Sequence, residues 1–369
     1  MTKLIIVSHT NDFHSAAVAL AMRDRGHCVD VIHGADFPQQ QAMTHRVSPS
    51  GSRLVISRPN RPNVTLDDAD VFWNRRQITH MLPEGVHEHD HRFVDRECRY
   101  FATGTWLGAA RNAFWINPDN ACAGARRKPY QLVTASELGV PIPDTLMSND
   151  PNEIRSFCGS YPSVVYKPFL PAGWATRDGG YAALFTVTVR PEDLPDDATL
   201  SKCPGIFQER VEKAYELRVT AMGRSLFAVK LHSQQLDWGR TDWRRAQGLG
   251  LVKEHVEVSD DVRAICEALM DRLNLVFGCF DFIVTPDGQA VFLEVNEMGQ
   301  WLWIEQAIPE LTLLDAFCDF CESRDPRFVY NTKVNPIRLQ PYEDAVRLFL
   351  EAEAAAHRSP GAWHVAAES

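Results

Sequence analysis

In the first part of the chain, short apolar runs lie on either side of a segment in which hydrophobic positions recur with the spacing of a helix. Lys3–Ser8 and Val29–His33 are predicted as buried strands. Phe13–Arg25 is predicted as the helix between them. A strand, a helix and a second strand in this order are typical of an α/β domain. The pattern continues with two shorter strands and a long helix, at Val55–Arg58, Val71–Asn74 and Arg92–Leu107.

Residues 1–117 therefore form one predicted α/β domain, and few of its residues suggest chemistry. The turn after the first strand, Ser8–Asp12, lacks the GxGxxG fingerprint, so no dinucleotide site is expected there. Arg75 and Arg76 follow a predicted strand. They either meet a carboxylate or phosphate of a substrate or serve as surface charges.

Two lysines lie at the ends of predicted elements in the middle of the chain. Lys128 opens a helix with Pro129 in its first turn. The helix dipole disfavours a cation there, so we expect an anionic group beside Lys128. Lys167 ends the predicted strand Ser163–Lys167, and GxxxxGK[ST] is absent around it. The loop that follows favours a flap over phosphates, and its glycines are Gly173, Gly179 and Gly180.

Two further strands are predicted around Ile206–Val211 and Leu217–Ala221. Glu216 and Arg218 share one face of the second strand because strand side chains alternate. The polar segment from Ser233 to Arg245 is either a loop that contacts substrate or a plain surface loop.

The segment from Phe280 to Trp303 predicts a β-hairpin, with strands Phe280–Thr285 and Ala290–Asn296. A two-residue turn at Asp287-Gly288 would place Thr285 opposite Ala290 and Asp281 opposite Glu294. Asn296 lies on the same face as Glu294. Opposed carboxylates destabilise a sheet unless a cation neutralises them, and Mg²⁺ prefers such oxygen ligands. The alternative is the solvated face of an amphipathic strand.

Composition excludes several classes of function. The chain has 369 residues, a formal net charge of -10 and a pI near 5.7, which argues against nucleic acid as a partner. No apolar run is long enough for a membrane span or a signal peptide, so we expect no membrane partner and a cytoplasmic protein.

Cysteine and histidine clusters do not predict metal sites. The nine cysteines are scattered, so a disulfide framework is not expected. Cys318 and Cys321 fall on one apolar stripe of a predicted helix, which favours a place in the core. The run from His87 to His91 follows Pro83-Glu84-Gly85 and has no apolar period, so a solvated loop is expected.

Taken in order, the candidate residues between positions 118 and 325 resemble the ATP-grasp fold. Within that superfamily the chain resembles the maturases of ribosomal peptides that make graspetides, the microviridin-type macrocyclic peptides. The first resemblance rests on Lys128 with Gln131-Leu132, Lys167, Gln208-Glu209-Arg210-Val211, Glu216-Leu217-Arg218, Asp281 and Glu294-Val295-Asn296. The second rests on the segments Gly299–Glu305 and Tyr215–Thr220, on His232-Ser233-Gln234 and on Asp242-Trp243-Arg244.

The resemblance implies an α/β (α+β) protein in which an N-terminal α/β domain precedes a two-lobed ATP-grasp fold. The implied division is residues 1–117 for the N-terminal domain, 118–205 for the small lobe, 206–330 for the C-terminal lobe with the metal hairpin, and 331–369 for a helical tail. The tail helix, about Tyr342–Ala356, packs either on its own domain or on a partner in a homodimer.

The resemblance also implies the role of each site residue. Lys128 and Lys167 would contact the phosphates of ATP, while Glu209 and the backbone of Val211 would hold the adenine and Glu216 the ribose. Asp281, Glu294 and Asn296 would ligate two Mg²⁺ ions. Arg218, Lys230 and Arg244 would stabilise the charge of the phosphoryl group. Glu297 is a departure, since these maturases usually place proline there, and it is expected to bring another carboxylate close to the metals.

The implied activity is an ADP-forming ligase that activates Glu or Asp side chains of a ribosomal precursor peptide as acyl phosphates. Attack by a Thr or Ser hydroxyl, or by a Lys amine, would close ω-ester or ω-amide rings. One alternative is a ligase that adds an amino acid to a free amino acid or to a protein terminus. The other is a peptide-binding module without catalysis, against which the retained lysines and metal ligands argue.

Overall fold

The N-terminal part of the chain is built on a parallel sheet, as the first β-α-β pattern predicts. The computed structural model describes residues 1–59, 61–76, 80–170, 172–175, 181–246 and 248–359. The sheet has the strand order β2-β1-β6-β7, and α1 connects its first two strands. Its elements are β1 (Lys3–Ser8), α1 (Phe13–Asp24), β2 (Cys28–His33), β6 (Val71–Asn74) and β7 (Phe114–Ile116).

A second, antiparallel sheet with the order β3-β4-β5 belongs to the same part, and only its middle strand was predicted. The helix α2 packs against β4, and the long C-terminal helix α10 packs against α1. The tail helix therefore lies on its own chain. These elements are β3 (Ala42–Ser48), β4 (Gly51–Arg58), β5 (Arg61–Thr65), α2 (His91–Ala109) and α10 (Glu343–Ala356).

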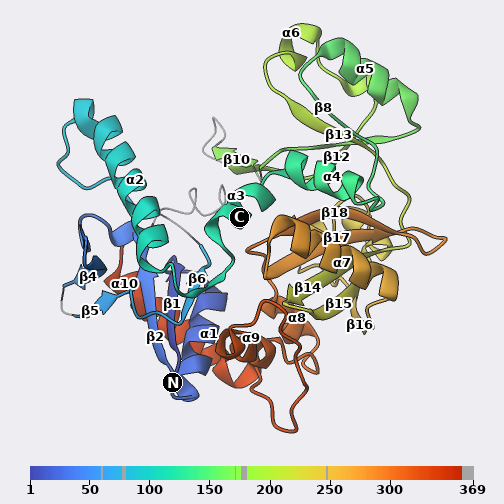
Figure 1. Cartoon of the computed structure of the whole chain (residues 1–369). Coiled ribbons are helices and arrows are strands. Elements are labelled where there is room, and N and C mark those ends of the chain that lie inside the picture. The colour runs from blue at the N-terminus through green and yellow to red at the C-terminus, as the bar shows by residue number, and fades with distance from the viewer. Residues whose placement is uncertain (60, 77–79, 171, 176–180, 247, 360–369) are drawn as a thin grey trace.

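Two antiparallel sheets make up the rest of the fold, and in Figure 1 the smaller one lies above the larger. The smaller has the order β12-β9-β13-β8 and packs against α5. Next to it, β10 and β11 form a hairpin in the expected flap, of which Gly179 and Gly180 lie outside the described residues. The elements are β8 (Thr145–Ser148), α5 (Pro151–Ser160), β9 (Val164–Lys167), β10 (Ala172–Ala175), β11 (Tyr181–Leu184), β12 (Val187–Val189), α6 (Asp197–Leu200) and β13 (Gly205–Glu209).

The larger sheet has the order β16-β15-β14-β17-β18. Apolar side chains of α3, α4 and α7 pack on it in one core cluster, while α8 and α9 share a second cluster with the N-terminal sheet and α1. The predicted α/β fold is thus confirmed. The elements are α3 (Asp119–Ala125), α4 (Lys128–Glu137), β14 (Tyr215–Met222), β15 (Ser225–Leu231), β16 (Lys253–Val256), α7 (Asp260–Leu273), β17 (Phe277–Val284), β18 (Ala290–Asn296), α8 (Leu302–Ala307) and α9 (Leu313–Ser323).

The division into lobes at residues 205 and 206 does not follow the strand pairing. Most of β13 was assigned to the C-terminal lobe, but β13 pairs with β8 and β9 of the smaller sheet. Likewise α4, assigned to the small lobe, contacts β18 and α7 of the larger sheet. The chain passes between the two sheets in residues 210–214, between β13 and β14.

The turn of the β17-β18 hairpin differs from the predicted two-residue turn. Gly288 N donates to Thr285 O at 2.9 Å and Thr285 N donates to Gln289 O at 3.0 Å, so the loop has three residues. Pro286 is favoured at the second position of such a type I turn, and Gly288 supplies the positive φ, 89°, that closes it. As a result Val284, not Thr285, lies opposite Ala290.

A β-bulge then restores the predicted pairing at the other end of the hairpin. The register shifts by one residue between Phe282 and Asp281, beside Leu293, and Asp281 lies opposite Glu294. The prediction of this carboxylate pair is therefore confirmed, although the turn that was used to derive it is wrong.

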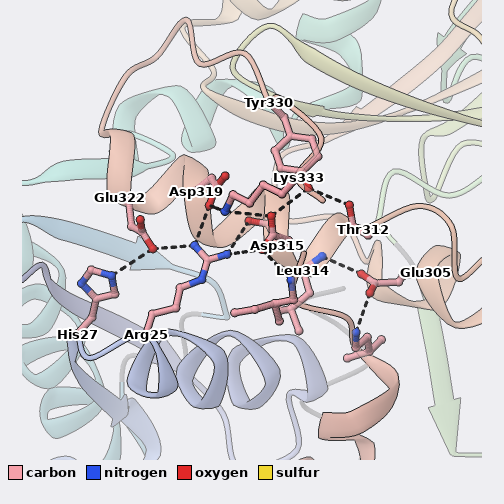
Figure 2. A network of polar contacts seen from close by, with 12 residues as sticks. Arg25, His27, Glu305, Thr312, Leu314, Asp315, Asp319, Glu322, Tyr330 and Lys333 are labelled. Atoms are coloured by element: carbon pink, nitrogen blue, oxygen red, sulfur yellow. Dashed lines mark hydrogen bonds and ion pairs between the residues drawn. The ribbon is translucent and has the colours of Figure 1, made fainter. Parts of the chain in front are cut away.

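A buried network of charges joins the end of α1 to α9 (Figure 2). Arg25 forms ion pairs with three carboxylates, at 2.6 Å from Asp315, 2.8 Å from Asp319 and 2.6 Å from Glu322. The side chain of Asp315 is only 1% exposed. Because a buried carboxylate needs its partners, this network fixes the N-terminal sheet against the C-terminal lobe.

We expect Arg25→Met to lower the free energy of unfolding by about 3 kcal/mol, because it removes the partner that three carboxylates share. Urea denaturation measures this loss without screening the charges. Arg155→Met is the matched control, since Arg155 pairs with Asp197 at the surface and the loss there should stay below about 1 kcal/mol. Equal losses in the two variants would contradict the role of Arg25.

The predictions for the cysteine pair of α9 and for the histidine-rich segment are confirmed. Cys318 and Cys321 are fully buried in the core, and all nine cysteines are free. Glu88–Asp90 is an exposed 3-10 turn in the predicted histidine-rich loop. Among the described residues, no helix combines the length and the apolar character needed to cross a membrane.

Candidate active site

A cavity of about 1040 Å³ lies between the smaller and the larger sheet. Its walls come from the end of β9, the chain between β13 and β14, and the facing residues of β17 and β18. Ten of the eleven predicted site residues line it, and Lys230 does not. Residues that lie far apart in the sequence are thus brought to one place.

The cavity is more basic than the chain that encloses it. Eight basic and six acidic side chains line it, although the whole chain carries a formal charge of -10. Such an excess of cations in a cleft favours an anionic ligand. The basic residues are Arg76, Lys128, Lys167, Arg210, Lys213, Arg218, Arg240 and Arg244.

Three oxygen-bearing side chains of the hairpin face the cavity together. Asp281 and Glu294 are cross-strand neighbours, and Asn296 lies two residues beyond Glu294 on β18. Burial raises the pKa of Asp281, whereas the ammonium of Lys128 lowers that of Glu294. Two carboxylates and an amide oxygen are a suitable ligand set for Mg²⁺, so these residues fit the ion that the sequence implies.

Lys128, at the start of α4, and Lys167, at the end of β9, border the cavity together with these carboxylates. Lys128 Nζ lies 3.4 Å from Glu294 Oε2 and donates to the carbonyl of Pro168 at 3.3 Å. Glu294 is the anionic group expected beside this helix entrance. Desolvation lowers the pKa of the Lys167 ammonium to about 8, and Glu294 partly opposes that shift. A cation that is poorly solvated gains most from an anionic ligand.

The three residues expected to hold adenine and ribose lie near the chain between the sheets. Glu209 ends β13 and accepts from the backbone N–H of Asp144 at 3.1 Å, while Val211 follows two residues later. The Glu216 carboxylate accepts hydrogen bonds from the Lys213 ammonium and from Ser233 Oγ, the latter at 3.0 Å. All three also border the cavity.

Arg218 and Arg244 are held in place by carboxylates. Arg218 Nη1 donates to Asp281 Oδ2 at 2.8 Å, and its buried Nε has no hydrogen-bond partner among the described residues. Arg244 forms a bidentate pair with Asp242, at 2.9 and 2.7 Å. Fixed guanidinium groups of this kind suit the planar oxygens of a phosphate or carboxylate.

Lys230 lies outside the cavity, contrary to its grouping with these arginines. It faces Leu217 across the ladder, and its ammonium lies 4.3 Å from the ring centroid of Tyr215. Lys230 pairs with Leu217 and not with Arg218, and strand side chains alternate, so Lys230 lies on the other face of the sheet from Arg218. The sequence pattern could not show this without the strand pairing.

Glu297 points away from the metal-ligand face, which corrects the expectation of a further carboxylate near the metals. Its Oε1 lies 2.5 Å from Arg126 Nε, and the side chain is 5% exposed. The backbone carbonyl of Glu297 accepts from Asn117 Nδ2 at 2.9 Å. Glu297 lies one residue beyond the end of β18, and its side chain does not line the cavity that Glu294 and Asn296 border.

Gly299 allows the chain to turn tightly after β18. A Cβ atom there would lie 2.4 Å from Cys279 Cβ and 2.9 Å from Arg218 Nη2. No other residue fits without moving the guanidinium. The two tryptophans that follow divide their roles: Trp301 is fully buried against Phe317, whereas Trp303 lines the cavity beside Trp243.

The N-terminal sheet fixes this loop through residues that the sequence did not single out for it. His14 Nε2 accepts from the backbone N–H groups of Trp301 and Leu302 at 2.9 and 3.1 Å. Burial lowers the pKa of His14, which keeps the ring neutral for this role. The guanidinium of Arg75, fully buried near Asp12, donates to the carbonyls of Met298 and Gly299.

The two arginines after β6 therefore have different surroundings. Arg75 is a buried structural residue and Arg76 borders the cavity, so neither is a simple surface charge. Asp12 and His14, at the start of a helix whose next turns, residues 16–22, are entirely apolar, were the signal in the sequence that could have indicated this support.

Comparisons with known proteins show which solved structures this chain resembles. No protein-family model matches the chain, and no curated protein matches it. Among solved structures, it is similar to a RiPP-associated ATP-grasp ligase of Chryseobacterium gregarium in complex with ADP and a leader and core peptide. The two share 26% identity with a TM-score of 0.81, over 89% of this chain and 100% of that chain.

Two macrocyclases of Microcystis aeruginosa MRC are also similar. MdnB is 27% identical with a TM-score of 0.72, over 87% of this chain and 99% of that chain. MdnC, bound with the precursor peptide MdnA, is 24% identical with a TM-score of 0.75, over 87% and 100%, and supports the fold alone. The resemblance inferred from the sequence is confirmed.

Proposed function

We propose that this chain, an ADP-forming ATP-grasp ligase with ATP and Mg²⁺ as cofactors, closes rings within a ribosomal precursor peptide. It would activate Glu or Asp side chains and join them to a hydroxyl or amine of the same peptide. The observation that carries the proposal is the cavity between the sheets, in which the Asp281, Glu294 and Asn296 oxygens face the two lysines.

The residues of the cavity suit each requirement of this reaction. A carboxylate does not condense with an alcohol or amine in water until its hydroxyl is converted into a leaving group, and phosphoryl transfer from ATP supplies that conversion. Asp281, Glu294 and Asn296 would hold Mg²⁺ on the phosphates. Lys128 and Lys167 would orient the phosphates, because their ammonium groups already lie beside Glu294.

Arg218 and Arg244 would stabilise the negative charge on the transferred group. Each guanidinium is fixed by a carboxylate before any ligand arrives, so little reorganisation is needed during the reaction. Trp243 and Trp303 form an apolar wall on the same side of the cavity and would exclude water from an activated carboxyl group.

A precursor peptide is the proposed partner. Three further statements stay predictions: that neither nucleic acid nor a membrane is a partner, that the chain forms a homodimer, and that the protein is cytoplasmic. Mass spectrometry tests the reaction: the enzyme is incubated with ATP, Mg²⁺ and a Thr- and Glu-rich peptide encoded beside its gene. We expect each ring to remove one water from the peptide and release one ADP.

Two controls separate this reaction from the alternatives. A peptide with Gln or Asn in place of its Glu and Asp residues should keep its mass, because it has no carboxyl group to activate. A peptide that gains the mass of an amino acid would instead support a ligase of the amino-acid-adding kind. Peptide binding without ADP release would support the non-catalytic module.

A further inference from the structure

A second group of metal-ligating side chains lies away from the cavity, between the N-terminal sheet and α10. His33, at the end of β2, meets Glu353 and His357, one helical turn apart at the end of α10. One ligand atom from each lies within 4.8 Å of the others. The three side chains are only 2%, 9% and 8% exposed.

The hydrogen bonds of the two imidazoles direct one nitrogen of each toward Glu353. His33 Nδ1 lies 3.2 Å from the carbonyl oxygen of Ser8, which can only accept, so that nitrogen carries a proton. His357 Nδ1 lies 2.5 Å from Asp36 Oδ2 and is protonated for the same reason. The lone pair of a neutral ring is then on Nε2 in both residues.

Both Nε2 atoms face the same carboxylate oxygen. His33 Nε2 lies 2.5 Å from Glu353 Oε2, so close that the two atoms share a proton. His357 Nε2 lies 3.4 Å from Glu353 Oε2, is buried and makes no hydrogen bond with a described residue. A metal ion would replace that proton and move His33 Nε2 away from Glu353, because ligand atoms about 2.0–2.1 Å from a tetrahedral Zn²⁺ lie about 3.3 Å from each other. His357 Nε2 and Glu353 Oε2 already lie 3.4 Å apart.

We propose that His33, Glu353 and His357 bind one divalent transition-metal ion, with Zn²⁺ as the ion that best suits two imidazoles and a carboxylate. Asp36 would orient His357 from outside the ligand set, as carboxylates commonly do for zinc-bound histidines. Arg61 approaches the other oxygen of Glu353, at 3.4 Å from Oε1, and leaves Oε2 to the ion.

The ion has a structural role, because none of the three ligands lines the nucleotide cavity. Two ligands lie on the last helix and the third on β2, so the ion ties the end of α10 to the N-terminal sheet. The sheet is the support on which Arg75 and His14 fix the loop after β18. The site is therefore independent of the proposed ligase reaction.

Zinc titration of the full-length, chelator-treated protein tests the proposal. The Glu294→Gln background removes one ligand of the Mg²⁺ site, so that Zn²⁺ bound there is not counted. We expect one tight equivalent of Zn²⁺ in this background and its loss on adding His33→Gln or His357→Gln. Asp36→Asn should weaken binding about 10- to 100-fold, as changes of outer-shell partners do.

His89→Gln, in the exposed histidine-rich loop, is the matched control and should bind Zn²⁺ unchanged. Co²⁺ gives a second readout, since a four-coordinate site shows visible absorption bands that His357→Gln should abolish. The thermal midpoint of unfolding should rise with Zn²⁺ in the parent protein, which carries only Glu294→Gln, and should not rise when His357→Gln is added. Equal Zn²⁺ affinity in the parent and in both histidine variants, or no tight equivalent in the parent, would overturn the proposal in favour of a shared proton.

Discussion

Glu294→Gln is expected to lower kcat for ring closure by about 100- to 1000-fold. The substitution keeps the size of the side chain but removes the negative charge at the centre of the oxygen cluster. Lys128 Nζ, 3.4 Å from Glu294 Oε2, loses its partner at the same time. The measurement is ADP release at saturating ATP and Mg²⁺, together with the mass of the peptide.

Glu297→Gln is the matched control for this substitution, since it makes the same chemical change three residues further along the chain. Its carboxylate pairs with Arg126 and does not line the cavity, so kcat should be retained and only stability should fall. Unchanged ATP turnover in Glu294→Gln would show that the assignment of the metal ligands is wrong.

Lys167→Met is expected to raise KM for ATP by about 100-fold, because a hydrogen-bonded charge pair with a phosphate contributes up to about 3 kcal/mol. The KM for ATP should also depend on pH. Burial lowers the pKa of Lys167 to about 8, so the free enzyme loses this charge as the pH rises through 8. Only the protonated form attracts phosphate, and KM should rise about tenfold per pH unit above that value.

Lys167→Arg separates this effect from a general loss of activity at alkaline pH. A guanidinium stays protonated over the whole range, so the KM of this variant should not change between about pH 7 and about pH 10. Lys202→Met, at an exposed lysine of the same lobe, should leave KM unchanged. An equal alkaline rise of KM in the wild type and in Lys167→Arg would exclude Lys167 as its source.

Most of the candidate site could be predicted from local patterns in the sequence. Lys167 ends a strand whose apolar run is visible in the sequence, and Glu294 and Asn296 share a face because strand side chains alternate. These features depend on a few neighbouring residues. Each needs only a short periodic segment, which a sequence displays directly.

The pairing of Asp281 with Glu294 was reached from the sequence by a route that the structure does not follow. A three-residue turn shifts the register by one residue, and the bulge beside Leu293 shifts it back. Turn type and bulge are backbone choices that depend on packing of the whole hairpin against α4 and α7. The sequence could not distinguish two compensating shifts from none.

The sequence by itself determined the fold class and the residues that meet in the cavity, because strand periodicity, helix ends and motif order are local. Only the tertiary structure decided which charged residues lie outside the cavity and what they contact. Glu297 pairs with Arg126, Arg75 donates to the loop after β18, and the Lys230 ammonium lies over the Tyr215 ring. It alone also joined His33 to Glu353, 320 residues away. Such partners come from separate elements, and their distances are set by packing, which no periodicity in the chain records.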